Sequence, residues 1–306
     1  MAVAAPVEIH VRTSEPPRLR MLVRSHELLG VREILGNLIR KEVKVKYTSS
    51  VLGAAWSMLN PVLYLVVFSL VFAVVLKNNV PNFAVYLLSG LLAWNLFATS
   101  LSLASRSIVD NGNLVTKVYF PREILPLASI GAASVDFGLQ ALVLIGFMAA
   151  FLYPFVGLNL LLLPLSLIAL YSFTVALALW VAALNVRYRD TQHLLNISLQ
   201  LWFWLTPIVF PSGLLYDKLL VEHHVPALWN LVLANPMATI IMGFQRSLYR
   251  IPHPLDKHGT PVHVLPPVGI GWLAGVLACV ALGSLLLAAL AWRTFFRLSG
   301  DFAEEL

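Results

Sequence analysis

Six long apolar stretches constrain the fold of this chain more than any other feature of its sequence. They comprise 141 of the 306 residues and contain one charged side chain, Asp136, whereas an overall charged fraction of 12% would place about 17 there. The stretches are residues 54–76, 84–105, 125–153, 160–184, 193–209 and 268–292. A bilayer core about 30 Å thick needs about 20 apolar helical residues, and backbone in lipid must satisfy its own hydrogen bonds. The sequence therefore predicts an all-α polytopic membrane protein with six transmembrane helices, and it excludes a soluble globular enzyme.

The distribution of Lys and Arg predicts the orientation of these helices. With both termini in the cytoplasm, the inner segments hold 16 Lys and Arg and the outer segments hold five. This imbalance agrees with the positive-inside rule. The net charge of +6 is thereby assigned to the inner membrane face and not to a nucleic-acid surface. We expect a multi-pass protein with both termini cytoplasmic and no nucleic-acid partner.

Charge and apolarity divide the chain into three segments. Residues 1–24 contain several Pro and Arg, which predicts a disordered cytoplasmic tail. Residues 25–53 are interpreted as an amphipathic interface helix and a turn, because apolar side chains share one helical side and cations, among them Arg40, Lys41 and Lys44, share the other. A soluble helix packed on a partner would have the same pattern. Residues 54–306 form the six-span transmembrane domain.

The outer connection between the fifth and sixth stretches carries an interrupted apolar segment. Residues 229–244 are apolar but broken by Asn235-Pro236, and 16 residues are short for a span. A seventh crossing would also move Arg293 and Arg297 to the outer side. The pattern therefore predicts re-entrant outer helices over about 226–249, with their turn at Asn235 and Pro236. Such backbone is tolerated where it is buried in protein or lines a water-filled cavity, which makes this segment a candidate pore element.

Three sequence motifs typical of ATPases, metalloproteases and serine hydrolases do not occur in this sequence. The dipeptide Gly-Lys is absent, which excludes a P-loop, and neither His-Glu-x-x-His nor Gly-x-Ser-x-Gly occurs. Cys279 is the single cysteine. Five of the eight histidines lie in the outer connection, but their spacing matches no compact zinc site, so a solvated loop is the simpler interpretation. We expect a non-catalytic subunit with no cofactor and no metal.

Aromatic side chains and one carboxylate are the candidates for a substrate channel. Tyr64, Phe68 and Phe72 recur at i, i+4 and i+8, and Trp94, Phe97, Trp202 and Trp204 lie too centrally for belt residues. Flat rings stack on sugar faces, although packing against helices or lipid would explain them equally. Asp136 is the intramembrane carboxylate, for which substrate passage or gating competes with a structural hydrogen bond to a neighbouring helix.

Two inner connections are candidates for receiving force from a partner. The segment between the second and third stretches is unexpectedly apolar for an exposed connection, which favours a short amphipathic helix that docks on another subunit. Its candidate contacts are Val115, Lys117, Tyr119 and Phe120. Arg187, Arg189 and Asp190, between the fourth and fifth stretches, either do the same or anchor the span through the positive-inside effect.

Several short motifs, in this order on this topology, resemble one family. They are Lys46-Tyr47, Ser50-Val51-Leu52-Gly53, the residues 56–61 ending in Asn60-Pro61, the residues 120–126 beginning Phe120-Pro121-Arg122, Arg187-Tyr188-Arg189-Asp190, Asn235-Pro236-Met237 and Phe244-Gln245-Arg246. From about residue 29 to 297 the chain is similar to the permease subunits of type-2 ABC transporters that export polysaccharides such as O-antigens, teichoic acids and mycobacterial galactan.

The resemblance implies a set of partners and a substrate. It implies a homodimer in the bacterial inner (cytoplasmic) membrane, two separate cytoplasmic nucleotide-binding ATPase subunits, and a substrate that is a lipid-pyrophosphate-linked glycan. It also implies that the aromatic side chains line the glycan path, and that Arg40, Lys41 and Lys44 contact the lipid pyrophosphate or anionic membrane lipids. One rival is a type-2 ABC permease for a drug or lipid. A remote rival, a membrane-integral glycosyl- or phosphotransferase, would need clustered carboxylates, whereas Asp136 stands alone in the apolar stretches.

Overall fold

The computed structural model describes residues 32–48, 50, 53, 55–70, 82–117, 120–153, 157–250 and 263–305. All regular secondary structure in these residues is helical. The expected tail over residues 1–24, the start of the interface helix before residue 32, and Leu52, Phe72 and Tyr119 lie outside the described residues.

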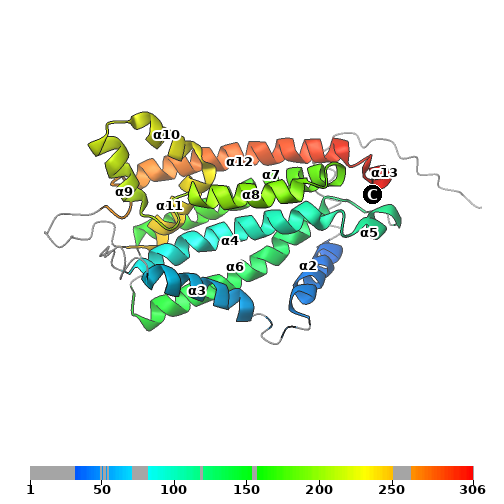
Figure 1. The fold of residues 1–306 in the computed structure, drawn as a ribbon, viewed down its shortest axis with the longest axis horizontal. Coiled ribbons are helices and arrows are strands. Elements are labelled where there is room, and N and C mark those ends of the chain that lie inside the picture. The colour runs from blue at the N-terminus through cyan, green and yellow to red at the C-terminus, as the bar shows by residue number, and fades with distance from the viewer. Residues whose placement is uncertain are drawn as a thin grey trace, which may run out of the picture.

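Four long helices run side by side along the molecule (Figure 1) and are apolar enough to cross a membrane. They are α4 (Phe83–Ser107), α6 (Ile124–Ala150), α7 (Leu162–Arg187) and α12 (Ile270–Leu298). These helices coincide with the second, third, fourth and sixth apolar stretches. At a rise of about 1.5 Å per residue, each exceeds the bilayer core of about 30 Å. The prediction of a helical multi-pass membrane protein is confirmed at this level.

Two further helices occupy the first and fifth apolar stretches but are shorter. The described part of α3 (Ala55–Leu70) has 16 residues, and α8 (Thr191–Trp204) has 14. They extend for about 24 Å and about 21 Å, less than the bilayer core. The described residues thus contain four full-length spans, or five if a bent helix pair counts as one. The count of six spans stays a prediction.

The bent pair lies where the sequence predicts an interruption. Helices α10 (Pro226–Ala234) and α11 (Pro236–Leu248) meet at Asn235 and are bent by 86°. Each begins with Pro, which lacks the amide hydrogen that a first helical residue does not need. The Asn235 side chain accepts a hydrogen bond from the amide of Met237 and so caps α11. The two short helices that meet at Asn235-Pro236 are present, whereas their re-entrant placement stays a prediction, and we call this pair the elbow.

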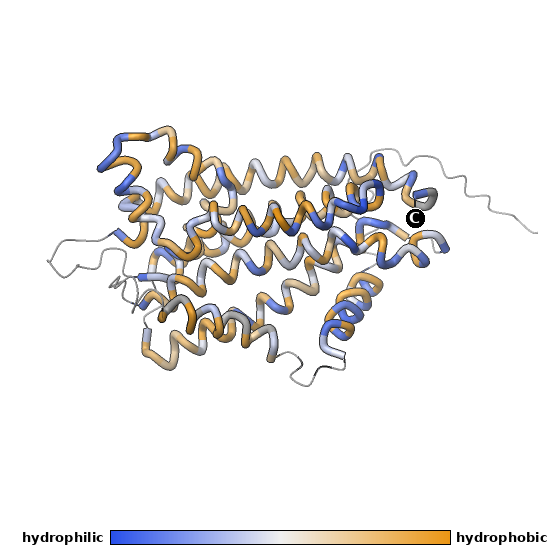
Figure 2. The backbone as a smooth tube through the Cα atoms, viewed as in Figure 1, coloured by the Kyte–Doolittle hydropathy of each residue, from blue (hydrophilic) through white to orange (hydrophobic). Residues whose placement is uncertain are grey.

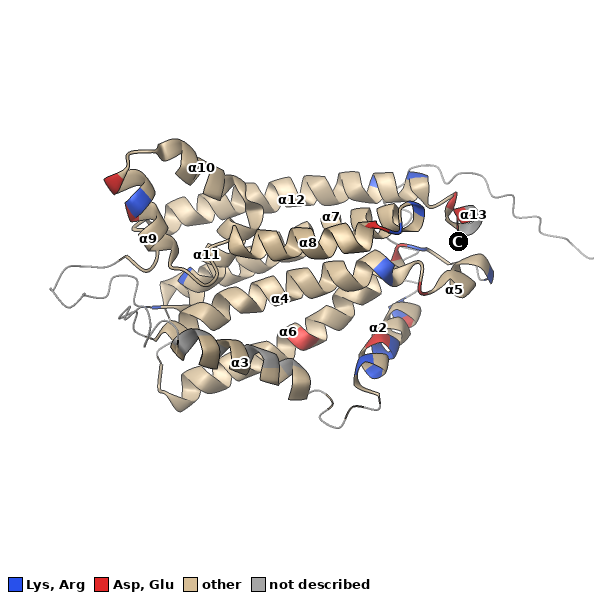
Figure 3. Ribbon diagram, viewed as in Figure 1, with Lys and Arg blue, Asp and Glu red and all other residues tan. Residues whose placement is uncertain are grey.

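Charged side chains gather at the end of the helix bundle opposite the elbow (Figure 3). This end, called the charged end below, holds α2 (Arg32–Tyr47), α5 (Gly112–Lys117), α13 (Phe302–Glu305) and the connection of residues 188–190. The elbow end holds α9 (Ser212–Tyr216), the π-helical turn η3 (Asp217–Glu222) and the elbow. Figure 2 shows apolar residues along the long helices between these ends.

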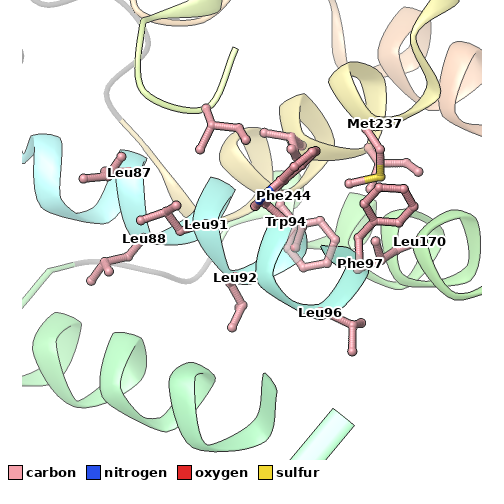
Figure 4. Close-up of a cluster of buried hydrophobic side chains, with 14 of the residues drawn as sticks. Leu87, Leu88, Leu91, Leu92, Trp94, Leu96, Phe97, Leu170, Met237 and Phe244 are labelled. Carbon is pink, nitrogen blue, oxygen red and sulfur yellow. The ribbon is translucent and has the colours of Figure 1, made fainter. Parts of the chain in front are cut away.

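Helix α4 lies at the centre of the core, and α12 lies at the surface of the bundle. Side chains of α4, α7 and α11 pack together in the cluster of Figure 4, where Trp94 and Phe97 face Met237, Phe244 and Leu170. In contrast, Leu282, Leu286 and Leu290 of α12 are exposed. A helix that is apolar on its exposed side as well as its buried side is typical of a membrane span. The fold thus buries α4 in protein and leaves α12 a face for lipid.

Candidate functional site

A group of stacked aromatic rings connects α4 with α7 and α8 in the bundle interior. The Phe97 ring lies 5.6 Å from Phe173, nearly parallel to it, and 5.3 Å from Trp202, edge to face. Trp94 lies 5.6 Å from Phe203. These spacings are those of favourable aromatic pairs. The structure therefore brings three of the predicted channel residues, Trp94, Phe97 and Trp202, into one cluster.

This aromatic cluster is buried within a single subunit. Trp94 and Phe97 have almost no exposed surface, and Trp202 is partly buried against the same core. Tyr64 on α3 and Trp204 on α8 are instead 39% and 58% exposed. The side chain of Phe68 is not described. In one subunit the candidate channel aromatics thus fall into a packed set and an exposed set, and only the exposed set is accessible to a ligand without rearrangement.

Asn235 joins the aromatic cluster to the elbow. Its Oδ1 accepts hydrogen bonds from Trp202 Nε1 at 2.9 Å and from the Met237 amide at 3.1 Å, while its Nδ2 donates to Thr206 Oγ1 at 3.1 Å. One amide side chain therefore caps α11, fixes an indole of α8 and binds Thr206, two residues after the end of α8. The sequence identified Asn235 and Pro236 as a turn but did not predict this network.

The chain between α8 and α9 is not helical, and neighbouring helices satisfy its backbone. Gln245 Nε2 of α11 donates to the Pro207 carbonyl oxygen at 3.2 Å. The Tyr86 hydroxyl of α4 donates to the Phe210 carbonyl oxygen at 3.1 Å and accepts from the Ser212 amide at 3.3 Å. Irregular backbone at membrane depth requires such partners because no water is available. The elbow and α4 thereby allow α8 to end early.

Asp136 of α6 is held by the end of α2. Lys46 Nζ lies 2.5 Å from Asp136 Oδ2, and the Tyr47 hydroxyl donates to Asp136 Oδ1 at 2.6 Å. The carboxylate is buried, whereas the Lys46 side chain is 45% exposed. Of the two roles considered for Asp136, the structural contact to a neighbouring helix is thus present. The resemblance singled out Lys46-Tyr47 as a motif, but the separation of 90 residues concealed its partner.

The rest of α2 packs on the charged end through one apolar side. Leu38 is buried beside Leu35 and Ile39, and the Ile39 side chain fills the space above Gly131 of α6, where an added Cβ would lie 2.4 Å from Ile39 Cδ1. Lys41 Nζ donates to Asn111 Oδ1 at 2.7 Å. Arg40 and Lys44 are exposed. Of the three predicted anion contacts, Arg40 and Lys44 face outward, and Lys41 also anchors the helix.

The candidate coupling residues divide into a buried set and an exposed set. Val115 of α5 and Phe120 are buried in the core of the charged end, so they fix the position of α5 rather than present themselves to a partner. Asn113, Thr116 and Lys117 are exposed. Among the described residues of this connection, the apolar side chains pack within the subunit and the exposed side chains are polar, whereas docking on a partner stays a prediction.

The final helix, α13, packs against both candidate coupling regions. It contacts α5 and α7. Phe302 is buried and lies edge to face with Phe295 at 5.5 Å, and Glu305 Oε1 lies 3.9 Å from Arg187 Nε. Arg187, Arg189 and Asp190 are all exposed. The charged end thus presents α5, α13 and residues 187–190 as one continuous surface, and no sequence pattern indicates the contacts of α13.

The outer histidines do not assemble a metal site within the described residues. No group of three His, Cys, Asp or Glu side chains there is arranged to hold a metal ion. His263 Nδ1 instead lies 2.8 Å from the Asp217 carboxylate and joins η3 to the segment before α12. His253 and His258 lie outside the described residues.

The long apolar helices define a polytopic membrane protein, with the elbow at one end of the bundle and an exposed charged surface at the other. Comparison with known families places the chain among such proteins, because residues 35–249 match the family described as ABC-2 type transporter. The chain belongs to this family, whose members are non-catalytic transmembrane subunits that work with ATPase subunits. The matched region extends from α2 through the elbow and so contains the aromatic cluster, Asp136 and both candidate coupling regions.

Curated relatives carry a more specific name. The chain is 35% identical over 225 residues to the O-antigen export system permease protein RfbA of Myxococcus xanthus, covering 73% of this chain and 83% of that protein. It is 29% identical over 218 residues to a protein of the same name from Klebsiella pneumoniae, covering 70% of this chain and 79% of that protein.

Proposed function

We propose that this chain is the membrane subunit of an ATP-driven exporter of a lipid-pyrophosphate-linked polysaccharide, with the charged end in the cytoplasm of a bacterial inner membrane. The observation that carries the proposal is the match over most of the chain to permeases named for O-antigen export. The orientation is supported by the gathering of Lys and Arg at the charged end, as the positive-inside rule requires.

A channel between two copies of the chain accounts for the exposed aromatic side chains. Tyr64 and Trp204 are exposed in one subunit, and α3 packs on α4 and α6 at the edge of the bundle. In a homodimer whose interface encloses the channel, such rings would offer stacking surfaces for sugars with little loss of side-chain entropy. Trp94, Phe97 and Trp202 would then support the channel wall and connect it to the elbow, which we interpret as the re-entrant outer gate.

Two cytoplasmic ATPase subunits would dock on the polar surface of the charged end. The exposed residues Lys117, Arg187, Arg189 and Asp190 lie on the two connections, and α13 contacts α5 and α7. Movement at this surface would reach the elbow through α4, which packs on α6, α7, α8 and α11. Arg40 and Lys44 on α2 face outward, where the pyrophosphate of the substrate or anionic lipid headgroups would meet them.

Depletion of the chain in the cell tests the proposed substrate. We expect polymer linked to its lipid carrier to accumulate on the inner face of the cytoplasmic membrane, and re-expression to clear it. A drug or lipid permease would leave the lipid-linked polymer unaffected, and that outcome would contradict the proposal.

The exposed aromatic set provides a second test of the channel. Tyr64→Ala and Trp204→Ala should lower polymer export while leaving the level of folded protein unchanged, because neither side chain is part of the core. Val62→Ala, which truncates another exposed side chain of α3, is the matched control and should export normally. Export that is equal in all three variants would exclude sugar stacking at these rings.

A further inference from the structure

The outward side of α8 carries two parallel stripes of side chains, one polar and one apolar. Within each stripe the residues are spaced by three, four and four positions, which aligns them along one side of a helix. The apolar stripe is offset from the polar stripe by one residue, so the two lie next to each other. The polar stripe consists of His193, Asn196, Gln200 and Trp204, the apolar stripe consists of Leu194, Ile197, Leu201 and Leu205, and all eight side chains are exposed.

Helix α8 lies at the depth of the membrane-spanning helices. It packs on α4 and α7, two of the long apolar helices (Figure 1), and it contains no Asp, Glu, Lys or Arg. Its N-cap residue, Asp190, belongs to the charged end, and Trp202 in its last turn donates a hydrogen bond to Asn235 of the elbow. The polar stripe therefore extends for about 16 Å from the charged end toward the elbow.

The amide side chains of the polar stripe do not suit a lipid environment. Asn196 and Gln200 are exposed, and neither forms a hydrogen bond to another group in the part of the chain that the structure describes. An amide that enters hydrocarbon without a hydrogen-bond partner loses its hydration at a high cost. Polar side chains at membrane depth accordingly face a bundle interior or a water-filled cavity. The leucines of the apolar stripe carry no such cost, so the two stripes favour different surroundings on the two sides of α8.

We propose that the polar stripe binds hydroxyl groups of the sugar units of the exported polymer. The proposal rests on the export function given above and adds His193, Asn196 and Gln200 to the exposed ring of Trp204. An amide side chain both donates and accepts hydrogen bonds, and so does a hydroxyl group. The indole of Trp204, on the next turn after Gln200, offers a flat surface to a sugar ring. Amide and indole together thus match the polar edge and the apolar face of one sugar.

The lack of charge on α8 suits a polymer that has to move. Hydrogen bonds between neutral groups are about half as strong as those to charged groups. Passage requires binding that is strong enough to admit the substrate and weak enough, at several successive sites, to release it. Asn196 and Gln200 are about 6 Å apart along the helix axis, so a hydroxyl that leaves one amide has a second one nearby.

A second copy of the chain is the rival occupant of the polar stripe. Asn and Gln side chains form hydrogen bonds between membrane helices, which would also satisfy Asn196 and Gln200. The exposed indole of Trp204 in line with these amides favours the sugar, because stacking on a ring uses its flat face. The two occupants give different products when a reactive group is placed on the stripe.

Photo-cross-linking in cells that export the polymer tests the contact. A benzophenone amino acid replaces Gln200 of the polar stripe in one variant and Leu201 of the apolar stripe in the matched control, since both positions are exposed and adjacent. After irradiation and purification under denaturing conditions, periodate staining detects polysaccharide attached to the chain. We expect a glycan adduct from position 200 and little or none from position 201. Equal adducts from both positions would overturn the proposal, and so would a product from position 200 that contains two copies of the chain and no glycan.

Substitution of the same residue measures the hydrogen bond. Gln200→Leu should lower the rate of polymer export about fivefold, as expected for one lost hydrogen bond between neutral groups. The amount of folded protein should not change, because the side chain is exposed. Leu201→Ala is the control and should export as the parent does. Unchanged export in Gln200→Leu, or a loss accompanied by a change in oligomeric state, would contradict a sugar contact.

The depletion experiment distinguishes a failure of this proposal from a failure of the export function. If depletion leaves lipid-linked polymer unaffected, the export function and the role of the polar stripe are both wrong. If the polymer accumulates on depletion but position 200 yields no glycan adduct, the export function stands and the assignment of the polar stripe alone is wrong.

Discussion

The contacts that attach α2 and α13 at the charged end differ in chemistry from those that hold the elbow. At the charged end, α2 is attached through Lys46–Asp136 and Lys41–Asn111, and α13 through Arg187–Glu305. At the elbow end, Asn235 joins Trp202 and Thr206 through hydrogen bonds between neutral groups. The charged contacts have a partner exposed to water, whereas the neutral network lies between packed helices.

This difference shows that the density of charged residues does not indicate where single substitutions lower the stability of the protein most. An exposed ion pair contributes little because water and salt screen it. The neutral network is partly buried, so the loss of one member leaves donors and acceptors unsatisfied away from bulk water, and each costs more than the net gain of its hydrogen bond. We therefore expect the elbow end to be more sensitive to single substitutions, and the charged end more sensitive to ionic strength.

Asn235→Ala should have the largest effect on stability. It removes the cap of α11 and the partners of Trp202 and Thr206, which together should cost about 2–3 kcal/mol of unfolding free energy. The measurement is unfolding in mixed micelles at two ionic strengths, where the loss should be the same. Asn235→Asp is the matched control, because it keeps the acceptor for Trp202 and for the Met237 amide. A loss in Asn235→Asp as large as in Asn235→Ala would contradict the assigned network.

Lys46→Met should lower the free energy of unfolding by less than Asn235→Ala does. It should lower it by more than Asp136→Leu, which removes the other partner of the ion pair. Without Lys46, the buried carboxylate of Asp136 loses its ion pair, whereas without Asp136 the partly exposed Lys46 reaches water. After discounting for this exposure, we expect a loss of about 1–2 kcal/mol for Lys46→Met.

The Lys46→Met/Asp136→Leu double variant should recover part of that loss, because neither charge is left. Thermal unfolding of the three proteins gives the comparison. Equal losses in the two single variants, with no recovery in the double variant, would show that the pair does not hold α2.

Gly131→Val tests the apolar half of the α2 contact. The new side chain would occupy the space that Ile39 fills, so we expect a loss of about 1 kcal/mol from local overpacking and a displaced α2. Ile39→Ala should relieve the clash when combined with Gly131→Val. Protection of α2 amides in hydrogen exchange is the readout. If the double variant is no better protected than Gly131→Val alone, the two side chains do not share this space.

Arg187→Ala should have the smallest effect on stability, at about 0.5 kcal/mol or less, because its pair with Glu305 is exposed and long. If residues 187–190 couple to an ATPase subunit as proposed, polymer export should nonetheless fall. Glu305→Ala breaks the same pair and serves as the comparison. A fall in export that is equal in both variants would assign the effect to α13, and a fall confined to Arg187→Ala would assign it to docking.

The sequence predicted those parts of the fold that depend on local pattern. Apolar length predicted α4, α6, α7 and α12, and Asn235-Pro236 predicted the elbow, because Pro cannot continue a helix without losing a hydrogen bond. The fifth apolar stretch was predicted to continue to residue 209, whereas α8 ends at Trp204. Thr206-Pro207 follows that end, and the search for uncharged stretches concealed it because neither residue carries a charge.

The candidate site was predictable only as a set of residue types. The central positions of Trp94, Phe97 and Trp202 in their apolar stretches indicate a role inside the bundle, but their burial in one subunit depends on how α4, α7 and α8 pack. Asp136 was selected as a lone charge, and its partner Lys46 is 90 residues away in the chain. Val115 and Phe120 suggested an exposed docking helix, yet apolar residues in a short connection pack inward as readily as outward. Pairings of this kind arise from tertiary packing, which no local pattern encodes.

The contact between Lys46 and Asp136 also bears on how the chain enters the membrane. A carboxylate at the centre of an inserting helix costs about 2.5–3.5 kcal/mol, which disfavours α6 as an independent unit of insertion. Because α2 precedes α6 in the chain, Lys46 and Tyr47 are already synthesised when Asp136 emerges from the ribosome. In the folded chain Lys46 and Tyr47 offset part of this cost, so we expect insertion of α6 to be more favourable once α2 has docked beside it.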